Sequence, residues 1–388
     1  MTKKLYDINN KLDRFTAEVI SVTENKGKIE IITDESAFFP EGGGQTCDKG
    51  TLCGMTVSHV SLRNGEIVHI IAPDDYTTPL SVGMTVEGEI DMKKRFSDMQ
   101  QHSGEHIVSG IMHRIFGCDN VGFHLGTEVV TLDFNVQPTA EQMQKVELLA
   151  NKAVWDNIPI EVFYPTREEA AALPYRSKKE VEGALRLVKI EGIDLCACCA
   201  PHVARTGEIG YIRFVNCENY KGGIRLSILC GERALIDCRA KLSQNSQIGS
   251  LLSAKEHETF KAAERLLNEK DNLARQMVEL RRQLISYKAE SIAHTEKVVY
   301  FEQSTDSSHI RELAIALKEK AQKFSAVFGC DGECAVKYAV CAVDSDAREI
   351  GKLVNENFAG RGGGKTDMVQ GTLNADVSAV TKFFETLD

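Results

Sequence analysis

The chain has 388 residues, of which 43% are hydrophobic and 26% are charged, a composition typical of a protein that buries a core. No apolar run approaches the roughly 18 residues of a membrane span. The first residues lack the apolar stretch of a signal peptide, so we predict a cytoplasmic protein without a membrane segment. The formal net charge of −10 argues against a broad, non-specific nucleic-acid surface, but it leaves room for a local basic face.

Residues 1–91 have the pattern of a small β-barrel. Two hairpin signals divide this segment. One is at residues 24–27, which end in Lys-Gly, and the other is Asn64 with Gly65, a dipeptide favoured in tight type I′ turns. Several short strands at this spacing predict a barrel.

The segment between the two hairpins, residues 38–45, reads Phe-Phe-Pro-Glu-Gly-Gly-Gly-Gln. Its glycines, Gly42, Gly43 and Gly44, expose backbone N–H groups and allow a ligand or another backbone to approach closely. These donors could bind a carbonyl or an oxyanion, and the amide of Gln45 adds both donor and acceptor capacity. A tight turn or a β-bulge is the structural alternative, but three glycines followed by glutamine favour a functional loop.

Residues 92–117 are predicted to form one helix, on which His102 and His106 stand four residues apart. Histidines at this spacing project from adjacent turns, about 6 Å apart along the axis, so both rings can reach one ion. Cys198 and His202 have the same spacing in a second segment. Two such pairs suit one tetrahedral zinc ion, provided that the segments converge. Because Glu105 directly precedes the second histidine instead of following the first, the pattern is not that of the usual metalloprotease.

Two questions about this site stay open in the sequence. Cys196 and Cys199 form a Cys-x-x-Cys pair, which could be redox-active or could supply metal ligands. Four tight ligands would make the zinc structural, whereas one loose ligand would admit a water whose pKa falls towards about 7.

The rest of the chain is expected to form three parts, which with the barrel give an α+β fold. Residues 92–239 add a helix at 140–157 and strands near 158–164, 185–190, 211–215 and 223–229 to the zinc helix, forming an α/β zinc-binding domain. Residues 240–292 are predicted as a long helical stalk, in the form of a coiled-coil hairpin or a dimer stalk. Leucines and a tyrosine lie there on a seven-residue spacing in which Thr259 fills one gap: Leu252, Leu266, Leu273, Leu280 and Tyr287. A helix packed on its own domain is the alternative. Residues 293–388 are expected to form a compact α/β domain.

This C-terminal domain contains a second glycine-rich segment, residues 357–365, which is predicted to be a loop. Three glycines lie here between two cations: Arg361, Gly362, Gly363, Gly364 and Lys365. Backbone donors beside two cations suit contact with phosphate or an RNA backbone, and a structural glycine turn is the alternative. Asp331 and Gly332 predict a turn between two strands.

In combination, four segments resemble the editing region of alanyl-tRNA synthetase and its free-standing relatives, the AlaX proteins. They are the loop at 38–45 with Asp48 and Gly50, the segment 101–106, residues 198–210, and residues 358–365. The last of these resembles the glycine-rich loop of the DHH-associated domain that ends the long AlaX type. The segments occur in family order and the resemblance covers nearly the whole chain.

The resemblance implies a hydrolase that deacylates tRNA(Ala) mischarged with serine or glycine. It implies one zinc ion per chain, held by four ligands: His102, His106, Cys198 and His202. It also implies an amino-acid pocket with Gln45 as the catalytic residue and four substrate contacts: Gly42, Gly43, Gly44 and Thr206. Because the barrel begins almost at residue 1, we expect no aminoacylation domain, no need for ATP, and action in trans. A homodimer through the stalk or the C-terminal domain is a further expectation.

Two departures from the family pattern keep the ligand spacing intact. Cys199, Ala200 and Pro201 stand in place of Gly-Gly-Thr, and Ser-Gly-Glu stands in place of Thr-Ala-Thr. A non-catalytic zinc module that binds tRNA is the main alternative, although the intact ligand spacing and the Gly-Gly-Gly-Gln loop favour an enzyme. A metal-dependent phosphoesterase is disfavoured because His309 is the only histidine of residues 296–388.

Overall fold

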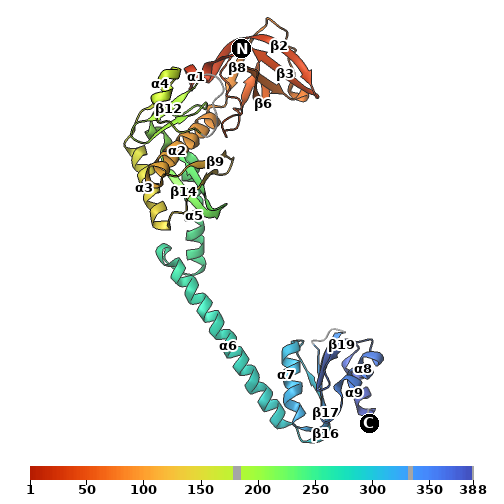
Figure 1. Cartoon of the computed structure of the whole chain (residues 1–388). Helices are drawn as coiled ribbons and strands as arrows, with labels where there is room; N and C mark the ends of the chain where they lie inside the picture. The colour runs from red at the N-terminus through yellow and green to blue at the C-terminus, as the bar shows by residue number, and fades with distance from the viewer. Residues whose placement is uncertain (178–184, 331–334, 387–388) are drawn as a thin grey trace. The chain divides into compact units, whose positions relative to one another are not determined.

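The structure is a computed structural model that describes residues 1–177, 185–330 and 335–386 (Figure 1). Contacts divide the chain into two compact units, residues 1–247 and residues 248–388. Both units mix helices with sheets, so the prediction of an α+β fold is confirmed. The finer division into four domains stays a prediction. Within the described residues, no helix combines the length and the hydropathy of a membrane span.

The first unit begins with a closed barrel whose strands follow the order β2-β3-β7-β6-β5-β8. The strands are β2 (Arg14–Asn25), β3 (Lys28–Thr33), β5 (Gly50–Leu52), β6 (Met55–Arg63), β7 (Glu66–Ile71) and β8 (Thr85–Ile90). Both predicted hairpins are confirmed. Lys26 and Gly27 turn β2 into β3 with φ of 51° and 70°, and Asn64 and Gly65 turn β6 into β7 with φ of 50° and 81°. The glycine-rich loop connects β4 (Glu35–Ser36) with β5, at one end of the barrel.

A long helix, α2 (Met92–Phe116), leaves the barrel directly after β8. Asp91 caps its start by accepting a hydrogen bond from the Lys94 N–H, and Gly117 ends it in a left-handed conformation with φ of 63°. Its apolar side packs in one core with α3 (Ala140–Trp155) and a four-stranded sheet. The order of that sheet is β14-β15-β10-β9: β14 (Ile212–Tyr220), β15 (Gly223–Cys230), β10 (Val130–Phe134) and β9 (Asn120–Leu125).

A smaller antiparallel sheet carries the cysteine cluster. It consists of β11 (Ile160–Phe163), β12 (Leu187–Ile190) and β13 (Asp194–Ala197), in the order β11-β12-β13. Strand β13 ends at Ala197. The second predicted ligand pair, Cys198 and His202, therefore lies in the segment that directly follows this edge strand.

The helical segment predicted over residues 240–292 is present but interrupted, and its role as a stalk stays a prediction. Helix α5 (Gly231–Leu251) ends before a break that contains Ser253 with φ of 50°, and α6 (Thr259–Ser291) begins after it. The Ala254 N–H donates to the carbonyl of Gly249 at 2.9 Å, which closes the end of α5. A Cβ at Gly249 would lie 3.0 Å from the Ala254 carbonyl oxygen, so a glycine allows the chain to fold back there.

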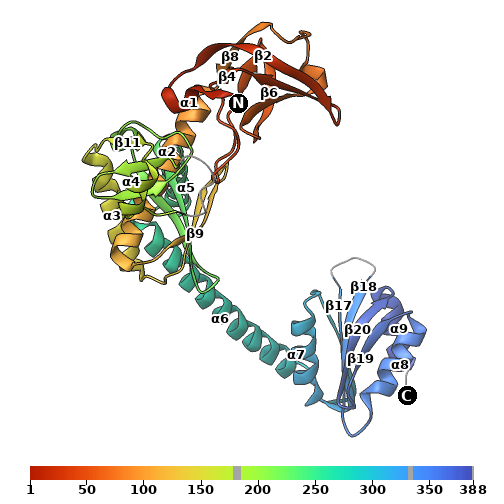
Figure 2. The same ribbon diagram turned by 45° about the horizontal axis from the view of Figure 1, so that its top comes forward.

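The second unit ends in a five-stranded sheet of order β16-β17-β18-β20-β19 (Figure 2). The strands are β16 (Thr295–Glu302), β17 (Ala321–Gly329), β18 (Ala335–Ala342), β20 (Met368–Asn374) and β19 (Arg361–Gly364). Helix α7 (Ser307–Lys318) and the end of α6 pack on one face, whereas α8 (Ala347–Asn357) and α9 (Val377–Thr386) pack on the other. The predicted turn at Asp331 and Gly332 lies outside the described residues.

The glycine-rich segment of this unit differs from the prediction. It is predicted to be a loop, but most of it forms an edge strand. Residues Arg361–Gly364 form β19 and pair antiparallel with β20. A Cβ at Gly362 would lie 2.4 Å from the Tyr338 hydroxyl, and one at Gly364 would lie 2.1 Å from the Met368 carbonyl oxygen. Close packing against β18 and β20 therefore explains two of the three glycines.

Candidate metal centre

Helix α2 and the segment after β13 bring the two predicted ligand pairs together. The rings of His102 and His106 lie 5.4 Å apart between centroids, as expected for adjacent turns. The ring of His202 lies 4.9 Å from that of His102 and 4.6 Å from that of His106. One candidate ligand atom from each of these histidines and from Cys198 lies within 4.8 Å of the other three.

The distances in this cluster fit a tetrahedral zinc ion. The Cys198 Sγ lies 3.5 Å from the Nε2 of His102 and 3.3 Å from the Nε2 of His202. With Zn–S of about 2.3 Å and Zn–N of about 2.0 Å, tetrahedral ligands place sulfur and nitrogen about 3.5 Å apart. The donor set and its spacing therefore fit zinc.

Each of the three rings also has a hydrogen-bond partner on the side away from the cluster. His102 donates from Nδ1 to the Gln45 Oε1 at 2.8 Å, and His106 donates from Nδ1 to the Asp194 Oδ2 at 2.9 Å. His202 donates from Nδ1 to the Ser103 Oγ at 3.0 Å. Partners on Nδ1 leave every Nε2 lone pair for a cation, which is the usual arrangement of metal-bound histidine.

Electrostatics in the cluster favour a thiolate. Burial alone would raise the pKa of the Cys198 thiol, but the neighbouring His102 ring lowers it well below its usual value. Burial lowers the pKa of His202 to about 3, so this ring is neutral at pH 7. Burial opposes the charge of His106 too, yet hydrogen bonds to Asp194 and Cys198 raise its pKa well above the usual value.

The glycine-rich loop of the barrel lies against the same cluster. Gly42 and Gln45 close a tight turn with two backbone hydrogen bonds of 3.1 and 3.0 Å, and Gly43 and Gly44 within it have φ of 60° and 83°. Among the described residues, no acceptor lies within hydrogen-bond reach of the Gly43 and Gly44 N–H groups. A Cβ at Gly44 would lie 2.5 Å from the Phe123 ring, so only glycine lets this loop pack on β9.

Gln45 joins this loop to the cluster. Its side chain is buried, and its Oε1 accepts the hydrogen bond from His102. Its Nε2 is also buried and has no hydrogen-bond partner in the described part of the chain. A buried donor without an acceptor is costly unless a ligand or water supplies one. The arrangement can therefore present an N–H group to an oxygen atom bound beside the cluster.

The chain is similar in sequence to several known proteins. A family model described as "Threonyl and Alanyl tRNA synthetase second additional domain" matches residues 185–226, the segment that contains Cys198 and His202. The alanyl-tRNA editing protein AlaX-L of Pyrococcus horikoshii is 26% identical over 97% of this chain and 95% of its own length. The alanyl-tRNA editing protein Aarsd1 of Mus musculus is 26% identical over 88% of this chain and 84% of its own length.

The chain is related to alanyl-tRNA editing proteins. It is also 29% identical to the alanine–tRNA ligase of Thermofilum pendens, but it spans only 44% of the length of that ligase. Among solved structures, the C-Ala domain of Aquifex aeolicus alanyl-tRNA synthetase is 21% identical and covers 23% of this chain and 86% of that domain. The TM-score of that match is 0.20.

One residue that the resemblance to editing proteins placed in the substrate pocket has a different set of contacts. Thr206 is buried, and its hydroxyl donates to the Ala153 carbonyl at 2.7 Å and accepts from the Ile158 N–H at 2.8 Å. These bonds tie the segment after His202 to α3 and to the residues just before β11. They favour a structural role for Thr206 over the predicted substrate contact.

Two neighbouring cysteines differ in environment. Cys196 is buried on β13, whereas Cys199 is exposed, and both are unpaired thiols. Burial raises the pKa of the Cys196 thiol, which does not favour the reactive thiolate that a redox pair needs. Cys198 lies in the cluster with the three histidines. Cys196 lies in a second, overlapping group with His106 and Asp194, whose candidate ligand atoms are also within 4.8 Å of one another.

Sequence reasoning missed the residues that support the ligands. Asp194 and Ser103 contact two of the rings, and Arg95 anchors the glycine-rich loop. No spacing rule identifies such partners, because each meets its target across the fold. The only local signal was the position of Asp194, at the start of the strand that leads to Cys198.

Proposed function

We propose that the chain is a trans-editing hydrolase that deacylates tRNA(Ala) mischarged with serine, and also with glycine. The observation that carries the proposal is the buried Gln45 amide, which is bound to His102 through Oε1 and leaves Nε2 without a partner in the described residues. It places a free donor beside a cluster with zinc-like spacing. The names of AlaX-L and Aarsd1 support the assignment to alanyl-tRNA editing.

The chemistry of an aminoacyl ester suits these residues. Its hydrolysis needs a placed water and stabilisation of the negative charge that develops on the carbonyl oxygen. The Nε2–H of Gln45 and the N–H groups of Gly43 and Gly44 are the donors that would hold that oxygen. Backbone donors on a tight turn are already oriented, so they need no reorganisation during the reaction.

His102, His106, Cys198 and His202 would hold one zinc ion per chain. A bound zinc ion supplies a Lewis acid that polarises an ester carbonyl or lowers the pKa of a bound water to about 7. The residues around the cluster keep the ligands in place: Gln45, Asp194 and Ser103 each accept a hydrogen bond from one ring.

A separate editing step after tRNA charging is physically reasonable for an enzyme that selects alanine. A pocket that accepts alanine cannot strongly reject a side chain that adds one hydroxyl group, whereas a site that hydrogen-bonds this hydroxyl can discriminate by up to about 10⁴–10⁵. A separate hydrolytic site is therefore the economical way to remove serine. The match along 95% of AlaX-L supports action in trans.

The test is single-turnover deacylation of Ser-, Gly- and Ala-tRNA(Ala) side by side, with and without a zinc chelator. We expect hydrolysis of the first two and not of the third, and loss of activity in the chelator. His106→Ala should lower the rate by at least about 100-fold, the scale of losing a strong electrostatic stabiliser. His113→Ala is the matched control, because His113 lies on the same helix and contacts the Cys118 carbonyl instead. Zinc and tRNA binding without hydrolysis would identify the non-catalytic module.

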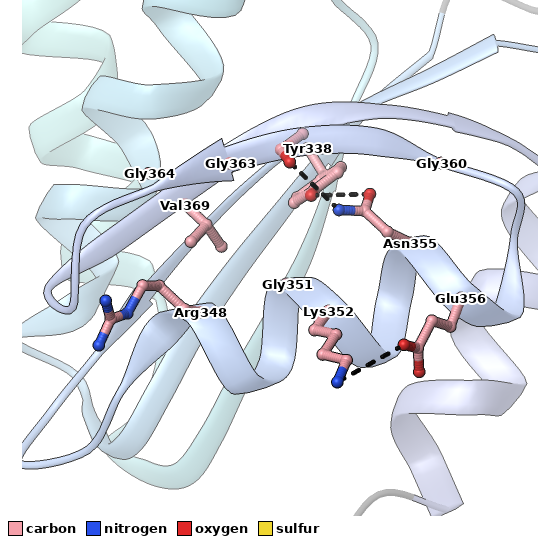
Figure 3. Close-up of a pocket in the computed structure, with 11 residues that line it drawn as sticks. Tyr338, Arg348, Gly351, Lys352, Asn355, Glu356, Gly360, Gly363, Gly364 and Val369 are labelled. Atoms are coloured by element: carbon pink, nitrogen blue, oxygen red, sulfur yellow. Dashed lines mark hydrogen bonds and ion pairs between the residues drawn. The ribbon is translucent and has the colours of Figure 1, made fainter.

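The C-terminal sheet offers a candidate contact for the tRNA backbone. An open pocket of about 500 Å³ lies between α8 and β19, lined among others by Arg348, Lys352, Gly363 and Gly364 (Figure 3). Arg361 and Lys365 flank the same glycines. We propose that Arg361 and Lys365 contact tRNA phosphates. The double variant Arg361→Ala with Lys365→Ala should therefore bind tRNA more weakly, and the number of counterions released on binding, read from the salt dependence of the affinity, should fall by about two.

We further propose that α6 pairs with α6 of a second copy. Its apolar side chains follow a heptad pattern and are exposed in the described chain: Leu266, Leu273, Met277, Leu280, Leu284 and Tyr287. A helix of 33 residues with such a stripe is long enough for a two-stranded coiled coil. Sedimentation equilibrium should give a dimer for the natural chain and a monomer for Leu273→Glu with Leu280→Glu; a natural monomer would contradict the pairing.

A further inference from the structure

We propose that Asp194, supported by Arg176, is the positioning residue that fixes the His106 ring and strengthens zinc binding by the cluster. This inference rests on the proposed metal site, and it assigns a role to two residues outside the ligand set.

The contacts of Asp194 point to this role. Asp194 is buried at the start of β13, and its Oδ2 accepts the Nδ1–H of His106 at 2.9 Å. Arg176 grips the same carboxylate with two hydrogen bonds of 2.8 Å, from Nε to Oδ1 and from Nη2 to Oδ2. The carboxylate is therefore held on both oxygens, and one of them is shared between a guanidinium and an imidazole.

The backbone keeps this arrangement in place. The N–H of Arg176 donates to the Leu195 carbonyl at 2.8 Å, and the Ala197 N–H donates to the Arg176 carbonyl at 2.9 Å. Both the arginine and the aspartate are thus attached to β13. These backbone hydrogen bonds hold Arg176 beside β13, which keeps its side chain close to that of Asp194.

A glycine on α2 permits the close approach of this strand. Gly110 lies one turn after His106, and a Cβ there would stand 2.4 Å from the Ile193 carbonyl oxygen and 2.8 Å from the Asp194 Cβ. Any larger residue would push β13 away from the helix. The fold therefore brings Asp194 to His106 through a contact that only glycine allows.

Asp194 differs in charge from the other two outer partners. His102 is bound to the neutral amide of Gln45 and His202 to the neutral hydroxyl of Ser103. A carboxylate requires the proton on Nδ1, which fixes the ring tautomer with its Nε2 lone pair towards the cluster. It also makes the imidazole a stronger donor to a cation, and loss of such partners typically weakens metal binding by about 10–100-fold.

The experiment measures Zn²⁺ affinity by competition with a chromophoric chelator, on the full chain and without tRNA. Asp194→Asn keeps an oxygen acceptor but removes the charge, and Asp194→Ala removes both. We expect zinc binding to weaken by about 10–100-fold, with the larger loss in Asp194→Ala. Asp133→Asn is the matched control, because Asp133 pairs with Arg225 through two similar hydrogen bonds of 2.7 and 2.8 Å on the four-stranded sheet. Its zinc affinity should equal that of the natural chain.

A spectroscopic measurement separates positioning from a general effect on the fold. In the zinc-loaded natural chain, the Nδ1 proton of His106 should give a slowly exchanging NMR signal. That signal should disappear in Asp194→Ala and persist in Asp133→Asn. The absorption bands of the Co²⁺-loaded chain should shift in Asp194→Asn, because the donor strength of one ligand changes.

Should Asp194→Ala fail to fold, Arg176→Lys provides the second variant, since it keeps the positive charge and loses the two-bond grip. Unchanged zinc affinity in both Asp194→Asn and Arg176→Lys would overturn the proposal. The proposed function fails separately: weaker zinc binding in the variants together with no hydrolysis by the natural chain would leave the positioning role standing. Zinc-dependent hydrolysis together with full zinc affinity in the variants would leave only the function standing.

Discussion

Arg95 and Asp48 form a fully buried ion pair that fastens the glycine-rich loop to the helix of the metal centre. The Arg95 Nε donates to the Asp48 Oδ1 at 2.8 Å, its Nη2 donates to Oδ2, and the same Nη2 reaches the Ala37 carbonyl at 2.6 Å. One guanidinium on α2 thus binds both ends of the loop. Because α2 also carries His102, the Arg95–Asp48 ion pair holds Gln45 at hydrogen-bond distance from the His102 ring.

Removing this guanidinium is expected to be costly. Arg95→Met leaves a buried carboxylate without its cation, so we expect the free energy of unfolding to fall by about 3–5 kcal/mol. Deacylation should fall as well, because the loop loses its attachment, whereas zinc affinity should stay within a few-fold. Urea unfolding and a chelator competition measure the two effects.

The control for this prediction is Arg63→Met. Arg63 also makes two contacts with a carboxylate, that of Glu30, but on the exposed side of the barrel. An exposed pair is worth no more than about 1 kcal/mol. Equal losses of stability in the two variants would contradict the anchoring role of Arg95.

Gln45→Glu tests the free amide donor. The variant keeps an oxygen acceptor for His102 but replaces the unpartnered Nε2–H group with an oxygen. If that group holds the developing oxyanion, the single-turnover rate should fall by about 10²–10³-fold, the usual loss for one oxyanion-hole donor. Zinc binding should persist, so the metal content of the purified variant is the control. A rate equal to that of the natural chain would remove Gln45 from the chemistry.

Gly43 and Gly44 offer a comparison within one turn. Both have positive φ, so an alanine at either position costs about 1 kcal/mol in backbone strain. At Gly43 the added Cβ would be 3.5 Å from the Cys199 Sγ, an ordinary contact, but at Gly44 it would be 2.5 Å from the Phe123 ring. We therefore expect Gly44→Ala to be clearly less stable and less active than Gly43→Ala in thermal unfolding and deacylation.

A smaller residue at position 123 should relieve this clash. Phe123→Leu in the Gly44→Ala background should recover part of the lost stability, and it should not do so in the Gly43→Ala background. Absence of any recovery would mean that the strained backbone, and not the ring, limits the loop.

The parts of the chain that could be predicted from the sequence share one property: their signals are local. His102 with His106 and Cys198 with His202 each lie four residues apart, so the geometry of one helical turn or one short loop suffices to pair them. Turn dipeptides such as Asn64 with Gly65 likewise fix a hairpin without reference to the rest of the fold.

The features that were missed depend on contacts across the fold. Asp194 meets His106, and Arg95 meets Asp48, through packing that no periodic pattern records. The glycines of β19 resemble a loop in sequence, but their neighbours on β18 and β20 require the small residue. The break near Ser253 interrupts an otherwise helical pattern. It is possible because the Gly249 carbonyl accepts a hydrogen bond from the Ala254 N–H, and because Gly249 has no side chain to crowd the Ala254 carbonyl.

His69 should make the barrel sensitive to acid. Its Nδ1–H donates to the Ile31 carbonyl at 3.1 Å, its Nε2 accepts from the Ser36 hydroxyl at 2.8 Å, and burial lowers its pKa from 6.5 to about 4. The unfolded chain binds a proton here below pH 6.5, whereas the folded chain does not do so until about pH 4. This contribution to stability is therefore complete above pH 6.5 and is lost as the pH falls towards 4, by about 3 kcal/mol in total.

His69→Gln isolates this effect, because the glutamine amide can donate and accept but does not titrate. Both proteins share the histidines of the metal cluster, so the difference between their unfolding free energies reports His69 alone. We expect the natural chain to be the more stable at pH 7 and this advantage to shrink by about 1.4 kcal/mol per pH unit between pH 6 and 4.5. Hydrogen exchange in β3 and β7 measures it locally. A constant difference across this range would show that the folded barrel binds a proton at His69 as readily as the unfolded chain.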